Sequence, residues 1–357
     1  MSTRCDFSDI SWMCLKGTFE EQFEQLFCHV RLSAEQAEND LLRLYEDVMN
    51  TVGSHWPGCE LSLFGSLHGG TALKTSDVDY YLQIPDQNMP VEEMCKEAKA
   101  ILSRRPDVFK ILAAIAHDVP CRKVTILHLP SNRECDLIIT SPELFSKEKN
   151  YIHLLHHLLH LDKKIRDLVV LVKYWAIVHK LLGPYFRNYI IILMMIFYLQ
   201  YLNVLPSIRR LQTNVPYIFW RNWNVAFEEF THFNNIQSSL RQLLMGFFQF
   251  YSAYDFEENV ISVFTGRSIA RKSYKDISGV SEDFELYKDN LRRKLCEPID
   301  LSTPMCVQDV FRHNRNCAYG VSPVLFQNIR MCLKSAAQLC GSESDETFLL
   351  AILTKPN

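Results

Sequence analysis

The amino-acid sequence predicts an α+β fold, in which a small mixed-sheet domain packs on a larger, mostly helical domain with a cleft between them. Short strand patterns are confined to residues before about 145, and long helical patterns dominate after 150. No glycine-serine linker separates the two parts, so we expect them to pack together. The expected domains are therefore 50–145 and 146–357, with N-terminal helices from 1–49 as a candidate addition to the helical one.

The bulk composition is that of an ordinary globular protein. The 357 residues are 48% apolar and 22% charged, and the formal net charge is −3. Because nucleic-acid binders are often strongly basic, any such contact is expected to come from local basic patches. Twelve cysteines include no CxxC pair, which argues against a zinc finger. The first residues do not resemble a signal peptide, so we expect reduced cysteines and a cytoplasmic location, with the nucleus as the alternative.

The elements before residue 90 follow from periodicity. Apolar residues recur at helical spacing over 17–52, which predicts helices. Residues 61–64 form a short apolar run that predicts a strand, and 78–84 alternate in the manner of a second strand. The intervening stretch, 65–77, is rich in glycine, serine and threonine and is expected to be a loop.

The elements after residue 90 follow in the same way. Charge and apolar spacing predict a helix over 91–103, and two strands are expected at 122–129 and 134–139, separated by a Pro-Ser-Asn turn. Residues 189–199 are an unbroken apolar run. That run is shorter than the ~20 residues that span a bilayer, so it predicts a fully buried helix and no membrane span.

Two aspartates at the start of the strand 78–84 carry the clearest chemical signal. Alternation along a strand places Asp77 and Asp79 on the same face. Neighbouring carboxylates repel each other unless a cation lies between them, and carboxylates together with substrate phosphates are typical ligands of divalent ions. Gly65 and Ser66 lie in the preceding turn, where glycine lets the backbone approach a phosphate and the serine hydroxyl can donate to it.

A third carboxylate would hold a second metal ion. Asp136 lies on the expected strand 134–139, after the turn. Two ions, Mg²⁺ or Mn²⁺, would stabilise both the attacking and the leaving oxygen of a phosphoryl transfer. An Asp-x-Asp pair alone is common in turns, so the alternative is a set of surface carboxylates. The preceding Gly-Ser turn and the third aspartate make the metal site the favoured interpretation.

At this point the chain resembles a known family. Residues 64–79, 162–206 and 306–323 are similar to segments of the polymerase-β-type nucleotidyltransferases. Within that superfamily they resemble the poly(A) polymerases and terminal uridylyltransferases that lack a separate RNA-recognition domain. The resemblance implies template-independent transfer of nucleotides from an NTP to the 3′-hydroxyl of single-stranded RNA, with release of pyrophosphate. It also implies that Asp77, Asp79 and Asp136 are the catalytic metal ligands.

The resemblance implies further roles in nucleotide binding. Lys173 matches the lysine that contacts the triphosphate, and Tyr189 matches the aromatic residue that stacks on the incoming base. Asp309 matches an acidic residue near the edge of the base. The alternatives are that Lys173 extends to solvent and that Tyr189 is a core tyrosine.

The sequence also departs from the family pattern. Ile177 stands where many relatives carry a second phosphate-binding lysine. Asn188 stands where a serine is usual, but its side-chain amide can still donate to a phosphate, so it is a candidate nucleotide-binding residue. Arg315 occupies a position where uridylyltransferases often have a histidine, and the usual asparagine follows as Asn316. Because arginine can donate to a uracil carbonyl, Arg315 favours UTP over ATP.

Several alternatives stay open. The chain could be an adenylyltransferase of the poly(A) polymerase type, or a synthase that joins free nucleotides into short signalling oligomers. It could also be a catalytically weak scaffold of the same fold, as Ile177 and Asn188 suggest. A protein partner that recruits the RNA is a further expectation.

Overall fold

The computed structural model describes residues 8–11, 13–32, 34–85, 89–113, 122–230 and 236–354. The chain separates into two compact units, Cys28–His156 and the combination of Met1–Phe27 with His157–Asn357. The first contains a mixed sheet and the second is mostly helical, so the predicted α+β class is confirmed. The predicted boundary between residues 145 and 146 and the predicted cleft stay predictions.

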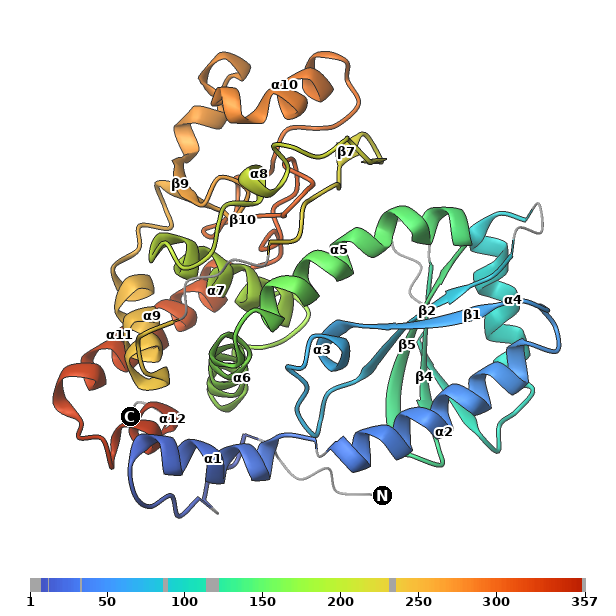
Figure 1. Ribbon diagram of the computed structural model, residues 1–357, viewed down its shortest axis with the longest axis horizontal. Helices are drawn as coiled ribbons and strands as arrows, with labels where there is room; N and C mark the ends of the chain where they lie inside the picture. Colours follow the sequence, from blue (N-terminus) through green and yellow to red (C-terminus); the bar gives the residue numbers. More distant parts are fainter. Residues whose placement is uncertain are drawn as a thin grey trace. The chain divides into compact units, whose positions relative to one another are not determined.

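A five-stranded mixed sheet forms the centre of the unit Cys28–His156 (Figure 1). Its order is β1-β2-β5-β4-β3. Strands β2 and β5 run parallel and every other pair is antiparallel. The bounds are β1 (Glu60–Phe64), β2 (Val78–Gln83), β3 (Phe109–Ala113), β4 (Lys123–His128) and β5 (Arg133–Thr140).

The two faces of this sheet differ in chemistry because side chains alternate along each strand. On β2, Val78, Tyr80 and Leu82 belong to a buried apolar core. Helices α2 (Ala34–Val52) and α4 (Val91–Ser103) cover that face and contribute leucines, valines and methionine to the core (Figure 1). The aspartates of β2 and β5 therefore point to the opposite face, which is only partly buried.

Two elements of this unit differ from the sequence prediction. Strand β3 (Phe109–Ala113) was not predicted. Its exposure alternates, with Phe109 and Ile111 toward the core and Lys110 exposed. Because the exposed Leu112 is also apolar, this alternation is hidden in the sequence. Residues 65–77 were expected to be a loop, but they begin with one helical turn, α3 (Gly65–His68). A single turn is too short to show helical periodicity in a sequence.

Two strongly buried helices run through the other unit. All but a few side chains of α6 (Lys163–Val178) are buried. In α7 (Asn188–Tyr201) buried residues lie on every side, which confirms the predicted buried helix over 189–199. Among the described residues, no helix combines the length and the apolar character that crossing a bilayer would require.

Most of the remaining elements belong to the helical unit, but most of α5 lies in the unit Cys28–His156. A short sheet of order β10-β8-β9 was not predicted, because its strands have only two to four residues. The other helices are α1 (Phe19–Val30), α5 (Pro142–His160), α8 (Ile208–Leu211), α9 (Leu240–Ala253), α10 (Glu285–Arg292), α11 (Pro323–Ser342) and α12 (Phe348–Leu353). The other strands are β6 (Phe219–Trp220), β7 (Trp223–Asn224), β8 (Asn259–Ser262), β9 (Arg267–Ala270) and β10 (Val307–Gln308).

Candidate active site

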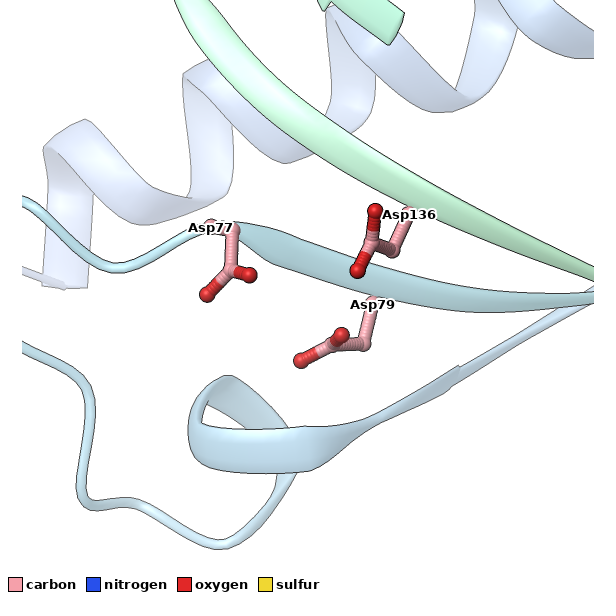
Figure 2. Close-up of side chains that lie close together, drawn as sticks. All are labelled: Asp77, Asp79 and Asp136. Atoms are coloured by element: carbon pink, nitrogen blue, oxygen red, sulfur yellow. The ribbon is translucent and has the colours of Figure 1, made fainter. Parts of the chain in front are cut away.

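Three aspartates converge on one face of the mixed sheet. Asp77 immediately precedes β2, Asp79 lies on β2, and Asp136 lies on the neighbouring strand β5 (Figure 2). Parallel pairing places Asp79 directly beside Asp136. One carboxylate oxygen from each residue lies within 4.8 Å of the other two. The structure therefore brings together the three carboxylates that the sequence singled out.

The spacing of these oxygens fits a divalent cation. Oxygens that share one Mg²⁺ at about 2.1 Å lie at most about 4.2 Å apart, so only a small rearrangement would close the set around an ion. Asp79 and Asp136 are partly buried and Asp77 is exposed. Three carboxylates this close repel each other, and a bound cation relieves that repulsion. The donor set thus suits hard divalent ions, which prefer oxygen ligands.

Gly65 shapes the turn beside the aspartates. Its φ of 70° lies in the left-handed region, which favours glycine. A Cβ atom at this position would overlap the carboxylate of Asp79. Ser66, the next residue, lies in the helical turn α3, and its backbone carbonyl accepts a hydrogen bond from Thr71 N at 2.9 Å. Glycine is therefore required here both for the backbone conformation and for the room that Asp79 occupies.

Two residues that the sequence did not single out bind Asp136. The ammonium of Lys123 lies 2.7 Å from Oδ2 of Asp136, and the hydroxyl of Thr125 donates to Oδ1 at 2.6 Å. Both residues lie on β4, where they alternate with the core residues Val124 and Ile126. That alternation was a usable signal, because polar residues at every second position share the face of the aspartates once β4 pairs with β5.

The negative charge of the aspartates raises the pKa of neighbouring side chains. Burial raises the pKa of the Cys135 thiol well above its usual value, and the carboxylates of Asp79, Asp136 and Asp77 raise it further. Burial also raises the pKa of Tyr81, with Glu148 adding to the effect, Arg122 opposing it and Asp79 adding to it. The Tyr81 ring packs against Phe145, with ring centroids 5.3 Å apart.

Three of the predicted nucleotide-binding residues lie on α6 and α7 of the helical unit. Lys173 is 4% exposed, so it does not extend freely to solvent. Asn188 is the first residue of α7, and within the described residues its buried Oδ1 has no hydrogen-bond partner. Tyr189 follows and is only partly buried, which leaves part of its ring accessible. Ile177, where relatives carry a lysine, is partly buried on α6.

The buried carboxylate of Asp309 contacts both Tyr189 and Arg315. Asp309 is 1% exposed, and its Oδ1 accepts hydrogen bonds from the backbone of Phe311 at 3.1 Å and Arg312 at 3.0 Å. Its Oδ2 accepts a hydrogen bond from the Tyr189 hydroxyl at 3.4 Å and lies 4.0 Å from Nη1 of Arg315. Asp309 therefore also has a structural function, because it caps the turn that follows it.

Asn316 holds the segment that carries Arg315. Its Oδ1 accepts hydrogen bonds from Val307 N at 3.1 Å and from Ala318 N at 2.9 Å. Its Nδ2 donates to Thr303 Oγ1 at 3.0 Å, and the side chain is 3% exposed. Because each of these bonds is shielded from water, Asn316 fixes the backbone next to Arg315.

Two family models match separate segments of the chain. The model described as poly(A) RNA polymerase, mitochondrial-like, central palm domain, matches residues 19–143. The model described as Cid1 family poly A polymerase matches residues 239–315. The first segment contains Asp77, Asp79 and Asp136, and the second contains Asp309 and Arg315.

Individual proteins similar to this chain are named as poly(A) polymerases or as a terminal uridylyltransferase. Terminal uridylyltransferase cid1 of Schizosaccharomyces pombe is 26% identical over 310 residues, which cover 81% of this chain and 70% of that protein. The human mitochondrial poly(A) RNA polymerase is 24% identical over 293 residues, covering 71% of this chain and 49% of that protein. A speckle-targeted PIP5K1A-regulated poly(A) polymerase of Danio rerio is 24% identical and is covered to 46%. The chain thus spans about half the length of the latter two.

Solved structures share the fold. The crystal structure of mtPAP in complex with UTP superposes with a TM-score of 0.77 at 18% identity, covering 95% of this chain and 73% of that one. The Cid1 poly(U) polymerase with MgGTP bound superposes with a TM-score of 0.74 at 20% identity, covering 95% of this chain and 99% of that one. The arrangement of helices and mixed sheet is therefore the one found in these nucleotide-binding polymerases.

Proposed function

We propose that this chain, which belongs to the polymerase-β-like nucleotidyltransferases of the poly(A) polymerase and terminal uridylyltransferase type, adds nucleotides to the 3′-hydroxyl of RNA. The reaction would need no template and would release pyrophosphate from the incoming NTP. The observation that supports it most is the convergence of Asp77, Asp79 and Asp136 on one face of the sheet, beside the Gly65 turn.

In this proposal the three aspartates hold two divalent cations, Mg²⁺ or Mn²⁺. When bound, such ions supply positive charge beside the attacking oxygen and the leaving pyrophosphate. Asp136 has a second task, which is to accept the proton of the RNA 3′-hydroxyl. Its orientation for that task comes from Thr125, whose hydroxyl donates to Oδ1 of Asp136 at 2.6 Å.

The remaining candidates would bind the nucleotide. Gly65 and Ser66 would offer the backbone and a hydroxyl to a phosphate. Lys173 and Asn188 would bind the triphosphate, and the partly exposed ring of Tyr189 would stack on the base. Holding the reactants in this way converts a bimolecular step into one within a complex, which lowers its barrier.

UTP is the proposed substrate. The side chain of Arg315 is 48% exposed, and its guanidinium lies 4.0 Å from the buried carboxylate of Asp309. That carboxylate orients Arg315, whose remaining N–H groups can donate to the carbonyl oxygens of uracil. An adenine edge has ring-nitrogen acceptors beside an amino donor, and Arg315, which only donates, cannot pair with that amino group, so adenine matches it less well.

An extension assay tests the proposal. The purified chain is incubated with a 5′-labelled RNA oligonucleotide, Mg²⁺ and each of the four NTPs separately. The expected result is a ladder that is longest with UTP and absent for Asp77→Asn. A longest ladder with ATP would identify a poly(A) polymerase instead. Short oligomers made from NTP without RNA would identify a synthase, and nucleotide binding without turnover would identify a scaffold.

The cytoplasmic location, with the nucleus as its alternative, and the protein that recruits RNA stay predictions.

A further inference from the structure

We propose that Lys123 is a positioning residue that occupies Asp136 in the metal-free protein, so that a divalent ion binding Asp136 must displace its ammonium. The inference rests on the proposed function in one respect, namely that the three carboxylates bind divalent cations. It adds that the two ions bind with unequal affinity. The ion held by Asp77 and Asp79 would bind first, and the ion that needs Asp136 would bind second and more weakly.

The position of Lys123 is fixed by the sheet. Strands β4 and β5 are antiparallel, and Thr125 lies directly opposite Asp136. Lys123 is two residues before Thr125, so its side chain leaves the same face of the sheet. Its ammonium reaches Oδ2 of Asp136 at 2.7 Å, while the Thr125 hydroxyl donates to Oδ1 at 2.6 Å. Each oxygen of Asp136 thus accepts a hydrogen bond from a side chain of β4.

The two contacts have opposite consequences for metal binding. Lys123 carries a full positive charge, and an ammonium and a metal ion that compete for one carboxylate oxygen exclude and repel each other. Thr125 is neutral and donates to the other oxygen, so it orients the carboxylate without adding charge. The side chains of Lys123 and Asp136 are 37% and 17% exposed, so solvent screens this pair only partly.

Lys123 also offsets the repulsion among the three aspartates. Asp77, Asp79 and Asp136 offer oxygens within 4.8 Å of one another, and their mutual repulsion costs stability when no cation is present. A lysine ammonium on Asp136 offsets part of that repulsion. Removing the ammonium should therefore destabilise the metal-free protein and, at the same time, strengthen binding of the second ion.

Mn²⁺ binding to the full chain tests this inference without measuring catalysis. The free Mn²⁺ concentration is followed by electron paramagnetic resonance in a titration without nucleotide. The wild-type chain should bind one Mn²⁺ tightly and a second weakly. Lys123→Met should lower the dissociation constant of the second Mn²⁺ at least about tenfold and leave the first unchanged. Thr125→Val should raise the second constant, because Asp136 loses its orienting donor.

A matched variant controls for the lost charge. Lys110 is an exposed lysine on the edge strand β3, which β4 separates from β5, so Lys110→Met removes one positive charge that does not contact Asp136 through β4. Lys110→Met should keep the wild-type binding curve, and Lys123→Arg, which retains the cation, should keep the second ion weak. Thermal unfolding gives an independent readout. Without metal, the melting temperature of Lys123→Met should be lower than that of wild type. Saturating Mn²⁺ should raise the melting temperature of Lys123→Met by more than it raises that of wild type.

The outcomes separate the two proposals. If wild type binds two Mn²⁺ and Lys123→Met binds the second no more tightly, the inference about Lys123 is wrong while the metal site stands. The inference about Lys123 is equally wrong if Lys110→Met behaves as Lys123→Met does. If wild type binds no Mn²⁺, or if Asp79→Asn leaves its binding unchanged, the metal site of the proposed function is wrong as well.

Discussion

At the scale of single residues, the backbone of Gly65 lies so close to the Asp79 carboxylate that no side chain fits between them. The left-handed φ of Gly65 directs the chain past the Asp79 carboxylate, and a methyl group there would overlap that carboxylate. Any side chain at residue 65 must therefore either displace Asp79 or shift the turn that contains Ser66. Both changes move the atoms that would position a phosphate and a metal ion.

Replacement of Gly65 by alanine should consequently reduce activity far more than stability. We expect the rate of RNA extension by Gly65→Ala to fall roughly 100-fold, because small displacements of reacting groups cost that much. Gly58→Ala is the matched control, since Gly58 also has a left-handed φ, of 82°, but a Cβ there makes only an ordinary contact with Pro85. Equal loss of extension rate in both variants would show that backbone strain, and not Asp79, is responsible.

At the scale of elements, strand alternation determined how much of the site was predictable. The sequence placed Asp79 and Asp136 on strands correctly, because Val78 and Cys135 mark the buried face next to them, and Asp77 lies immediately before β2. It did not reveal Lys123 and Thr125 as partners of Asp136, since no local pattern states which strands become neighbours. The order β1-β2-β5-β4-β3 places β5 beside β2, although β3 and β4 lie between them in the sequence.

Other elements were beyond the sequence signal for physical reasons. Strand β3 exposes the apolar Leu112, which hides its alternation, and the strands β8 to β10 are too short for a period of two to show. The sequence did not predict that Asp309 is buried. Its carboxylate accepts hydrogen bonds from the turn that follows it and from the hydroxyl of Tyr189 on α7, and the contact with α7 is distant in the sequence. The family resemblance pointed to Asp309 without revealing this structural function.

The segment after β10 makes a pH-dependent contribution to stability. His313 packs between Phe264, at 4.0 Å between ring centroids, and Phe284, and burial lowers its pKa to about 3. The unfolded chain takes up this proton as the pH falls through 6.5, whereas the folded chain stays neutral until about pH 3. The stabilisation is therefore complete above pH 6.5 and is lost as the pH falls from 6.5 toward 3.

Denaturant unfolding at two pH values measures this effect. Between pH 7.5 and pH 5.5 the free energy of unfolding should fall by about 1.4 kcal/mol through His313 alone. His313→Phe keeps an aromatic ring in the cluster and should lose that component, whereas His153→Gln, at an exposed histidine of α5, should keep it. An unchanged pH dependence in His313→Phe would contradict the assignment.

At the scale of the whole molecule, the three aspartates and most of the candidate nucleotide-binding residues lie in different units. The unit Cys28–His156 holds the three carboxylates, and the helical unit holds Lys173, Asn188, Tyr189, Asp309 and Arg315. The segments matched by the two family models divide these residues in the same way where they cover them. If Lys173 and Asn188 bind the triphosphate as proposed, the departures from the family pattern at Ile177 and Asn188 should weaken NTP affinity without removing the metal ligands.

Incorporation of a single nucleotide tests the central claim most directly. The chain is given a labelled RNA, Mg²⁺ and a 3′-deoxy-NTP, so that each RNA can grow by one residue only. The account predicts one added nucleotide with wild type, none after chelation of the metal, and none with Asp79→Asn at unchanged thermal stability. Addition that persists in Asp79→Asn, or with the metal removed, would contradict it.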